Sequence, residues 1–234
     1  GGRAMIRARC HPRLEPILPK PVPAAKALPD WFRAMPAEVA APSLGGEPVR
    51  TLKHCPPVID ALSTGVLIPL AADLAVAEGE VSWNWDPPVL EDARITRAPV
   101  GLHVAEQAEG APFRLGAGVV LKFMNFWTLE APEGFSLLFT HPLNREDLPF
   151  RTLSGVVDCD LFRDGYVHFP ALWADPGFEG TLPRGTPVAQ VFALPRAAQG
   201  LETGVMGEEE IARNRDVQRA LAEERGVYRK RFRH

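Results

Sequence analysis

The sequence has few cysteines and no long hydrophobic run. Its three cysteines, Cys10, Cys55 and Cys159, are an odd number without a repeating spacing among 234 residues. This argues against a disulfide framework and predicts a reducing, cytoplasmic compartment. No apolar stretch reaches the ~20 residues that a membrane helix needs, and the segment after Met5 lacks the apolar core of a signal peptide. We therefore expect no contact with a membrane.

The sequence also lacks the motifs of several common enzyme classes. It contains no GxSxG, GxGxxG, GxxxxGK[ST], CxxC or HExxH pattern. These absences argue against serine hydrolases of the common type, Rossmann oxidoreductases, P-loop enzymes and zincins. The formal net charge of −3 gives no sign of a general nucleic-acid-binding protein.

Proline, in contrast, is abundant. The chain has 24 prolines, about twice the usual ~5%. Because prolines end helices and avoid central strands, their spread along the chain predicts many short strands joined by rigid turns. The segment 12–36 is especially rich in proline, and we expect it to be an extended arm packed on the rest of the domain.

Hydrophobic alternation predicts strands over most of the chain and a helix only near its end. In 81–86 the alternation places Trp83 and Trp85 on one buried face. Residues 37–50 are expected to be a loop. The expected helices are 31–35, 58–63 and 207–225. The segment 66–76 is expected to form one or two strands, and the other expected strands are 5–10, 81–86, 102–107, 118–132, 135–142, 153–159, 165–173 and 187–194.

These elements predict a mainly-β fold, a distorted barrel or jelly roll, because the strands alternate with turns and not with helices. We expect a single mainly-β domain over residues 5–196. A C-terminal helix on its surface and a basic tail would then occupy residues 197–234.

The segment GVVDCD carries the first candidate site. In a strand, Asp158 and Asp160 would share one face ~7 Å apart, and Cys159 would be buried on the other. Two such carboxylates raise one pKa unless a cation or a metal compensates, which suits a general base or a metal ligand. We expect Asp158 to line a pocket, with Arg163 as its nearest candidate partner. The alternative is a turn in which the aspartates accept hydrogen bonds from backbone N–H groups.

Two histidines offer a second, weaker candidate. His141 and His168, with Asp158 or Asp160, would make a two-histidine, one-carboxylate site for Fe²⁺ or Zn²⁺. No local HxH or HxD motif accompanies them, so a structural role for each histidine is the alternative.

Two segments together resemble the dUTPase/dCTP-deaminase superfamily, which has a β-clip fold. GVVDCD begins at Gly155, and GTPVAQVF follows thirty positions later at Gly185. The resemblance implies catalytic roles for Asp158 and Asp160, and a contact between Gln190 and the nucleotide or a neighbouring subunit. It also implies Mg²⁺ and a homotrimer. If the protein binds a nucleotide in this way, we expect substrate contacts from Asn144, Arg145 and Arg163, with Arg151 as an alternative phosphate contact.

The sequence departs from the superfamily pattern at three places, one of which is the absence of an Arg-Gly-x-x-Gly-Phe-Gly segment near its C-terminal end. Leu161 stands where the stacking tyrosine is expected, and HPLNRED stands where the superfamily has a phosphate-binding motif. A second resemblance covers more of the chain, from LPDWFRAMP to GTPVAQ. It is to a family of phage and bacterial proteins to which no activity is attached, so it adds no mechanism.

Three functions therefore remain open at the level of sequence. The first is binding or hydrolysis of a nucleotide-like small molecule on a dUTPase-like β scaffold, with an aspartate as base or metal ligand. The second is a non-haem metal enzyme on a β-barrel with histidine and aspartate ligands. The third is a non-enzymatic assembly or interaction protein that uses its aromatic strand faces and basic tail as contact surfaces.

Overall fold

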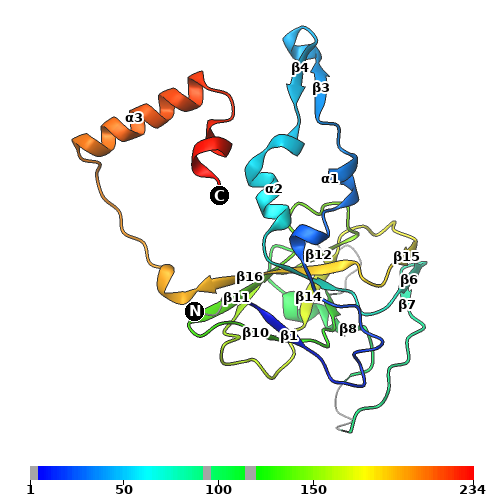
Figure 1. Ribbon diagram of the computed structural model, residues 1–234. Coiled ribbons are helices and arrows are strands. Elements are labelled where there is room, and N and C mark those ends of the chain that lie inside the picture. The colour runs from blue at the N-terminus through cyan, green and yellow to red at the C-terminus, as the bar shows by residue number, and fades with distance from the viewer. Residues whose placement is uncertain (1–4, 92–95, 114–119) are drawn as a thin grey trace. The chain divides into compact units, whose positions relative to one another are not determined.

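The structure is a computed structural model that describes residues 5–91, 96–113 and 120–234 (Figure 1). The chain divides into two compact units, Gly1–Ala198 and Gln199–His234. Within the described residues, sixteen strands and few helices make the fold mainly β, which confirms the expected fold class. Each sheet among these residues keeps two open edges, so the fold is not a closed barrel.

The largest sheet is antiparallel and has β16 at its centre. Its order is β13-β11-β16-β5-β2. Residues alternate between its two faces, and the second to fifth residues of β16, Val188 to Val191, are all buried. The bounds of its strands are Val22–Pro23 for β2, Val66–Pro69 for β5, Phe135–Thr140 for β11, Gly155–Val157 for β13 and Pro187–Pro195 for β16.

Four smaller sheets complete the β structure. A four-stranded sheet has the order β12-β14-β9-β8, with bounds Phe150–Thr152, Phe169–Trp173, Val120–Phe123 and Val100–His103. A three-stranded sheet has the order β15-β6-β7, with bounds Gly180–Leu182, Leu74–Ala77 and Glu80–Ser82. The two-stranded pairs are β1 with β10, Arg7–Arg9 and Thr128–Glu130, and β3 with β4, Glu38–Ala41 and Glu47–Arg50.

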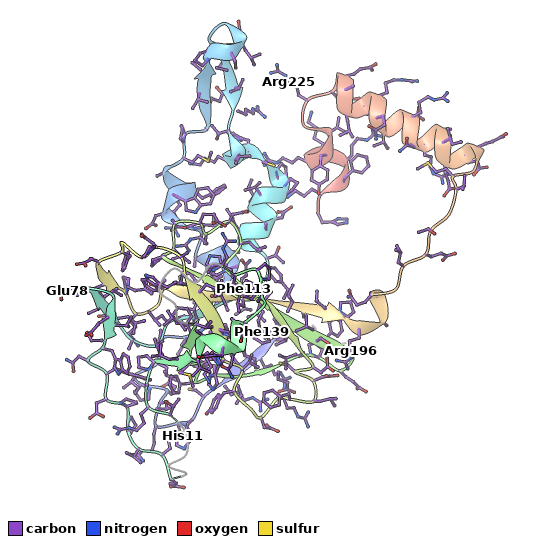
Figure 2. All side chains as sticks on the ribbon, turned by 180° about the vertical axis from the view of Figure 1, so that it is seen from behind. His11, Glu78, Phe113, Phe139, Arg196 and Arg225 are labelled. Atoms are coloured by element: carbon purple, nitrogen blue, oxygen red, sulfur yellow. The ribbon has the colours of Figure 1, made fainter. Side chains whose placement is uncertain are left out.

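Phenylalanines from several sheets fill the main core. Phe123 packs edge-on against Phe150, and Phe139 lies against Phe169. All four are almost completely buried, and burial of each such side chain contributes ~1.5–3 kcal/mol. Figure 2 shows Phe139 inside the β unit and Arg196 at its edge, where β16 ends.

The proline-rich arm adds a second, smaller core. Leu14 and Leu18 are buried there with Phe126 and Trp127, and the Trp127 indole N–H donates to the Pro19 carbonyl at 3.1 Å. The arm then joins the largest sheet as β2 and forms the short helix α1, Asp30–Ala34. It therefore forms part of the folded β unit.

The turn between helix α2, Pro56–Ser63, and β5 depends on a glycine. Gly65 has φ +79°, and a Cβ at this position would lie 2.2 Å from the Val191 carbonyl oxygen. Its own carbonyl accepts from Ala24 N at 3.0 Å. Only glycine fits here, because both the backbone conformation and the close approach of β16 exclude a side chain.

The second unit contains one long helix, α3, Glu208–Glu223. Three glutamates occupy its first turn, where negative charge is favoured by the helix dipole. The Glu210 carboxylate also accepts from Gly207 N at 2.8 Å. The basic tail forms a π-helical turn over Tyr228–Phe232. Packing of α3 on the outside of the β unit stays a prediction.

Four expectations about local structure were wrong. The strand expected over 102–107 ends at His103, and residues 105–108 form a 3₁₀ turn. Residues 37–50 contain the hairpin β3–β4 and not only a loop. The strand expected over 81–86 ends at Ser82, so its two tryptophans do not share a face: Trp85 packs on Phe126, whereas Trp83 lines a separate apolar cavity with Trp173. The strand expected over 118–132 is interrupted between β9 and β10, and its residues 118 and 119 lie outside the described chain.

The remaining short helices lie in connections. None of the helices in the described ranges combines the length and the apolarity of a membrane span. The 3₁₀ turns are η1 Ala24–Lys26, η2 Pro42–Leu44, η3 Leu52–His54, η4 Ala105–Ala108 and η5 Arg196–Ala198.

Candidate functional site

The two aspartates of GVVDCD lie in a turn immediately after β13. The strand ends at Val157, and the Asp158 carbonyl accepts hydrogen bonds from Leu161 N at 3.0 Å and Phe162 N at 2.8 Å. The expectation that both acids lie on one strand face is therefore wrong, because the chain already turns at Asp158. Because the chain turns here, strand alternation does not determine where the two carboxylates point. Their hydrogen-bond and ion-pair partners indicate their roles.

Cys159, between the two aspartates, points into the main core. It is completely buried, as expected. Burial raises the pKa of its thiol to about 11, and the neighbouring Asp158 and Asp160 charges contribute to the rise. The thiol therefore stays protonated and serves as a small apolar anchor for the turn.

Asp160 is fully engaged by the protein. Arg196, in the turn that follows β16, donates to both of its oxygens, from Nη1 at 3.0 Å and from Nη2 at 2.5 Å. Gly134 N donates to Oδ2 at 3.0 Å. The Arg196 hydrogen bonds lower the pKa of Asp160 to about 2, against the opposing effect of burial, and the Gly134 bond acts in the same direction. The same pair raises the pKa of Arg196.

Asp158 is only partly engaged. Ser136 Oγ donates to its Oδ1 at 2.6 Å, and Arg196 Nη1 lies 3.6 Å from the same atom. Its side chain is 55% exposed, and no partner of Oδ2 occurs among the described residues. One guanidinium therefore faces both carboxylates, and the only free carboxylate oxygen of this pair belongs to Asp158.

The sequence reasoning missed Arg196. Its position follows from the pairing of β11 with β16, in which Phe135 lies opposite Pro195. This register brings Arg196 N to the Gly134 carbonyl at 3.0 Å and its side chain to Asp160. The signal that could have found it is the hairpin-like antiparallel pairing of two apolar segments far apart in the chain.

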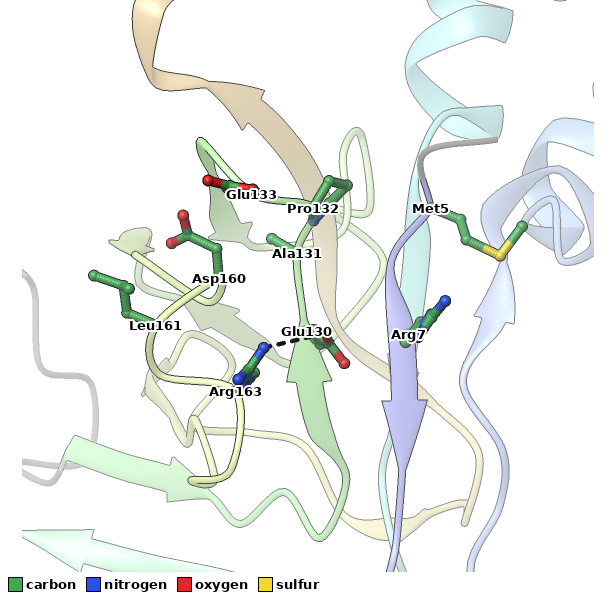
Figure 3. Close-up of a pocket in the computed structure, with 9 residues that line it drawn as sticks. All are labelled: Met5, Arg7, Glu130, Ala131, Pro132, Glu133, Asp160, Leu161 and Arg163. Atoms are coloured by element: carbon green, nitrogen blue, oxygen red, sulfur yellow. Dashed lines mark ion pairs between the residues drawn. The ribbon is translucent and has the colours of Figure 1, made fainter. Parts of the chain in front are cut away.

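An open polar cavity of about 610 Å³ lies beside the turn. Asp160 and Arg163 line it from one side (Figure 3). Arg7 on β1 lines it from another, because β1 pairs with β10 and places Arg7 opposite Glu130. The full lining is Met5, Arg7, Glu130, Ala131, Pro132, Glu133, Asp160, Leu161 and Arg163. Asp158, which we expected to line a pocket, is not among these residues, because the turn brings Asp160 and not Asp158 to the cavity wall.

Charges in this cavity largely face partners. Arg163 Nη1 lies 3.9 Å from Glu130 Oε1, the pair joined in Figure 3, and Arg9 Nη2 lies 3.1 Å from the other oxygen of Glu130. Arg163 thus pairs with Glu130 and not with Asp158. The Leu161 side chain is 79% exposed at the rim.

The other residues proposed for substrate binding lie elsewhere. Gln190 is 1% exposed; its amide accepts from Leu143 N at 2.9 Å and donates to the Ala61 and Thr64 carbonyls at 2.9 and 2.7 Å. Its hydrogen bonds link β16 to the C-terminal end of helix α2 and to the connection after β11. Asn144 has φ +58°, within a tight connection after β11, and Arg145 lines a second cavity.

The two histidines are held by backbone groups. His141 Nδ1 accepts from Thr152 N at 3.0 Å and Nε2 lies 2.9 Å from the Arg145 carbonyl. His168 Nδ1 accepts from Asn125 N at 3.0 Å. Burial lowers the pKa of both, that of His168 to about 4, where Lys122 adds to the effect.

The histidines and aspartates do not form a metal site. No group of three histidine, cysteine or acidic side chains in the described ranges is placed to hold a metal ion. A ligand set for Fe²⁺ or Zn²⁺ from His141, His168 and the two aspartates therefore does not fit this geometry.

Comparison with known proteins gives distant structural likenesses only. No family model matches the chain, and no curated protein matches it. The chain is similar to the native dUTPase of EIAV, with 10% identity and a TM-score of 0.28 over 38% of this chain and 72% of that one. It is also similar to a mutant dUTPase from phage phi11 of S. aureus, with 12% identity and a TM-score of 0.33 over 62% and 84%. Both belong to the group that the two motif segments resemble, but likenesses this distant say nothing of site residues or activity.

Proposed function

We propose that the protein binds a nucleotide-like small molecule in the cavity beside residues 158–163. The observation that carries the proposal is the unequal engagement of the two aspartates. Asp160 is held by Arg196 and Gly134, which fixes the turn, whereas Asp158 keeps a free oxygen. A rigid turn with one free carboxylate is what positions an acceptor for a ligand hydroxyl or a water molecule.

The cavity supplies the complementary groups. Arg7 and Arg163 offer guanidinium donors for phosphate oxygens. Met5 and Leu161 offer apolar contact. Asp158 does not line the cavity, but it lies two residues before Asp160, which does. Its free oxygen would accept from the sugar hydroxyl of a ligand that extends past Asp160. In a hydrolysis reaction, Asp158 is also the group that would accept a proton from water. Gln190 is not part of this proposal, because its amide is used inside the fold.

Mg²⁺ fits this site only if it binds together with a phosphate-bearing ligand. Mg²⁺ is commonly held by one or two carboxylates together with substrate phosphates and water, so it needs no cage of three protein ligands. Asp158 is the carboxylate that would contact it here. When bound, the ion would neutralise phosphate charge. The trimer implied by the family resemblance stays a prediction, which sedimentation analysis would test.

Calorimetric titration with dUTP, dCTP and the other nucleoside triphosphates, each with Mg²⁺, tests the proposal. We expect saturable binding of at least one nucleotide. The variant Asp158→Asn should weaken it by about 10-fold or more, since a hydrogen bond to a charged group contributes ~1.5–3 kcal/mol. Arg163→Gln should act in the same direction.

Asp164→Asn is the matched control. It removes a carboxylate from the same turn region, but Asp164 is exposed and, unlike Asp158, is not held by Ser136 and Arg196. Its nucleotide affinity should stay within about twofold of the wild type. Failure of every nucleotide to bind, or equal affinities for the wild type and Asp158→Asn, would contradict the proposal.

A further inference from the structure

A second cavity, of about 440 Å³, lies between the proline-rich arm and the largest sheet. Residues 19–33 of the arm, with the turn around Gly185 and the connection after β11, form its walls. Leu67, Pro69 and Pro187 give it an apolar side. It shares no lining residue with the cavity beside Asp160.

Basic side chains dominate this second cavity. Lys20, Lys26, Arg33 and Arg145 line it, against a single acidic residue, Asp30. The excess of positive charge stands out because the chain as a whole carries a formal charge of −3. Like charges gathered around one concave space repel one another, and a bound anion relieves this repulsion.

Two of these cations have no role within the fold. The side chains of Lys26 and Arg33 make no ion pair and no hydrogen bond with any described residue. Lys20, by contrast, lies 3.2 Å from Glu15. Lys26 and Arg33 are thus available to an anion from solution.

Arg145 is the basic residue of this cavity whose side chain is already held in one position by the protein. Its side chain is only 14% exposed, and Asp147 holds the guanidinium through bonds of 2.9 and 3.0 Å. Burial opposes ionisation of Asp147, but these bonds outweigh it and lower its pKa. The His141 ring also contacts the Arg145 carbonyl at 2.9 Å. A guanidinium fixed in this way loses little freedom when it binds an anion.

The arm side of the cavity is also rigid. Val22 pairs with Leu67 in the sheet, and the Lys53 ammonium donates to the Arg33 and Met35 carbonyls at 2.8 and 2.9 Å. Prolines restrict the backbone between these anchors. The basic residues of the arm are therefore presented from a fixed backbone.

We propose that this basic cavity is a binding site for a small phosphorylated molecule, whose phosphoryl group is bound by Lys26, Arg33 and Arg145. Several cations, two of them guanidinium groups, suit a multiply charged phosphate better than a single carboxylate. The apolar side leaves room for a short uncharged part of the ligand. The site is independent of the nucleotide site proposed at Asp158.

Titration of the full chain with inorganic pyrophosphate, with inorganic phosphate as the weaker probe, tests this site. We expect saturable binding of pyrophosphate that weakens as salt is added. The double variant Lys26→Gln/Arg33→Gln should lose about tenfold or more in affinity. Both side chains are exposed, so the variant should fold, which circular dichroism would check.

Two control variants test whether pyrophosphate binding belongs to this cavity. Arg50→Gln removes an exposed arginine of the hairpin β3–β4, away from the cavity lining, and should leave pyrophosphate binding unchanged. Arg163→Gln removes a guanidinium that we assign to phosphate binding in the cavity beside Asp160. It should also leave pyrophosphate binding unchanged, which distinguishes this site from the nucleotide site. Absence of pyrophosphate binding at low salt, or equal losses in Arg50→Gln and the double variant, would overturn the proposal.

Discussion

The segments 155–160 and 185–192 both carry polar residues in apolar surroundings, but they use them differently. Gln190 lies within β16, the central strand, and its amide makes three hydrogen bonds, two to the end of helix α2 and one to the connection after β11. Asp158 lies just beyond the end of the edge strand β13, half-exposed, with one oxygen free. A polar side chain in a central strand must be satisfied inside the protein, whereas one after an edge strand stays open to a ligand.

Of the variants that test this comparison, Gln190→Ala should have the largest effect on the free energy of unfolding. The change Gln190→Ala leaves the Leu143 N–H and the Ala61 and Thr64 carbonyls without their side-chain partner. Unsatisfied buried groups cost ~1–3 kcal/mol each, so we expect the free energy of unfolding to fall by about 3 kcal/mol or more. Chemical denaturation measures this.

Gln107→Ala is the control for that change, because Gln107 is exposed and, within the described ranges, its side chain hydrogen-bonds to His103 alone. Its effect should be within about 0.5 kcal/mol. An equally small effect of Gln190→Ala would show that the central strand does not depend on its amide, and the contrast between the two segments would fail.

A substitution of Cys159 tests whether this buried side chain anchors the turn after β13. The change Cys159→Ala should lower the free energy of unfolding by about 1–2 kcal/mol, since it leaves a small cavity in the main core. Cys55→Ala is the matched change at a partly exposed cysteine and should cost less. Thermal or chemical denaturation of both variants would compare them. Equal costs would indicate that the turn after β13 is not anchored through Cys159.

A smaller and pH-dependent effect is expected at Asp160. Its pKa of about 2 in the folded protein lies below the ordinary value of 3.8, so the unfolded chain takes up the proton first. The stabilisation by Asp160 is therefore complete above about pH 4 and is lost as the pH falls to about 2. The stability difference between the wild type and Asp160→Asn should shrink over this range.

Denaturation curves at several pH values measure that difference. Asp164→Asn serves as the control, since Asp164 makes no ion pair within the described residues. A constant difference between the wild type and Asp160→Asn from pH 5 to pH 2 would show that the Arg196 pair does not hold Asp160 ionised.

The smallest effect on stability is expected at Asp158. In Asp158→Asn, the amide oxygen still accepts the Ser136 hydroxyl, so the free energy of unfolding should change by less than about 0.5 kcal/mol. The same variant should show the large loss of nucleotide affinity described above. A variant that is strongly destabilised would place Asp158 among the structural residues, with Asp160.

Much of the fold was predictable because it depends on local patterns. Alternation located most strands, and the acidic start of 207–225 located α3 within two residues of its ends. Prediction failed where tertiary packing decides the structure. The spacing of Trp83 and Trp85 does not show that the strand ends at Ser82. It also does not show that Trp85 packs on Phe126 while Trp83 lines a separate cavity.

The site was predictable only in part for the same reason. The sequence singled out Asp158 and Asp160, but not which of them is free. That difference depends on Arg196, which reaches the pair through the register of β11 with β16. For Gln190, the sequence motif was recognised but the role was not predicted. The residue is buried because β16 is the central strand of its sheet, and the strand order cannot be read from a single sequence.

The central position of β16 also constrains how the protein is made on the ribosome. β5 is complete at residue 69, yet one of its two neighbours in the sheet is β16, which begins at residue 187. At ordinary rates of synthesis, β5 waits on the order of ten seconds for this neighbour. β11 waits for it as well. Nascent chains that end before residue 195 therefore expose unpaired apolar strand edges, and we expect them to be the forms that chaperones bind and proteases remove.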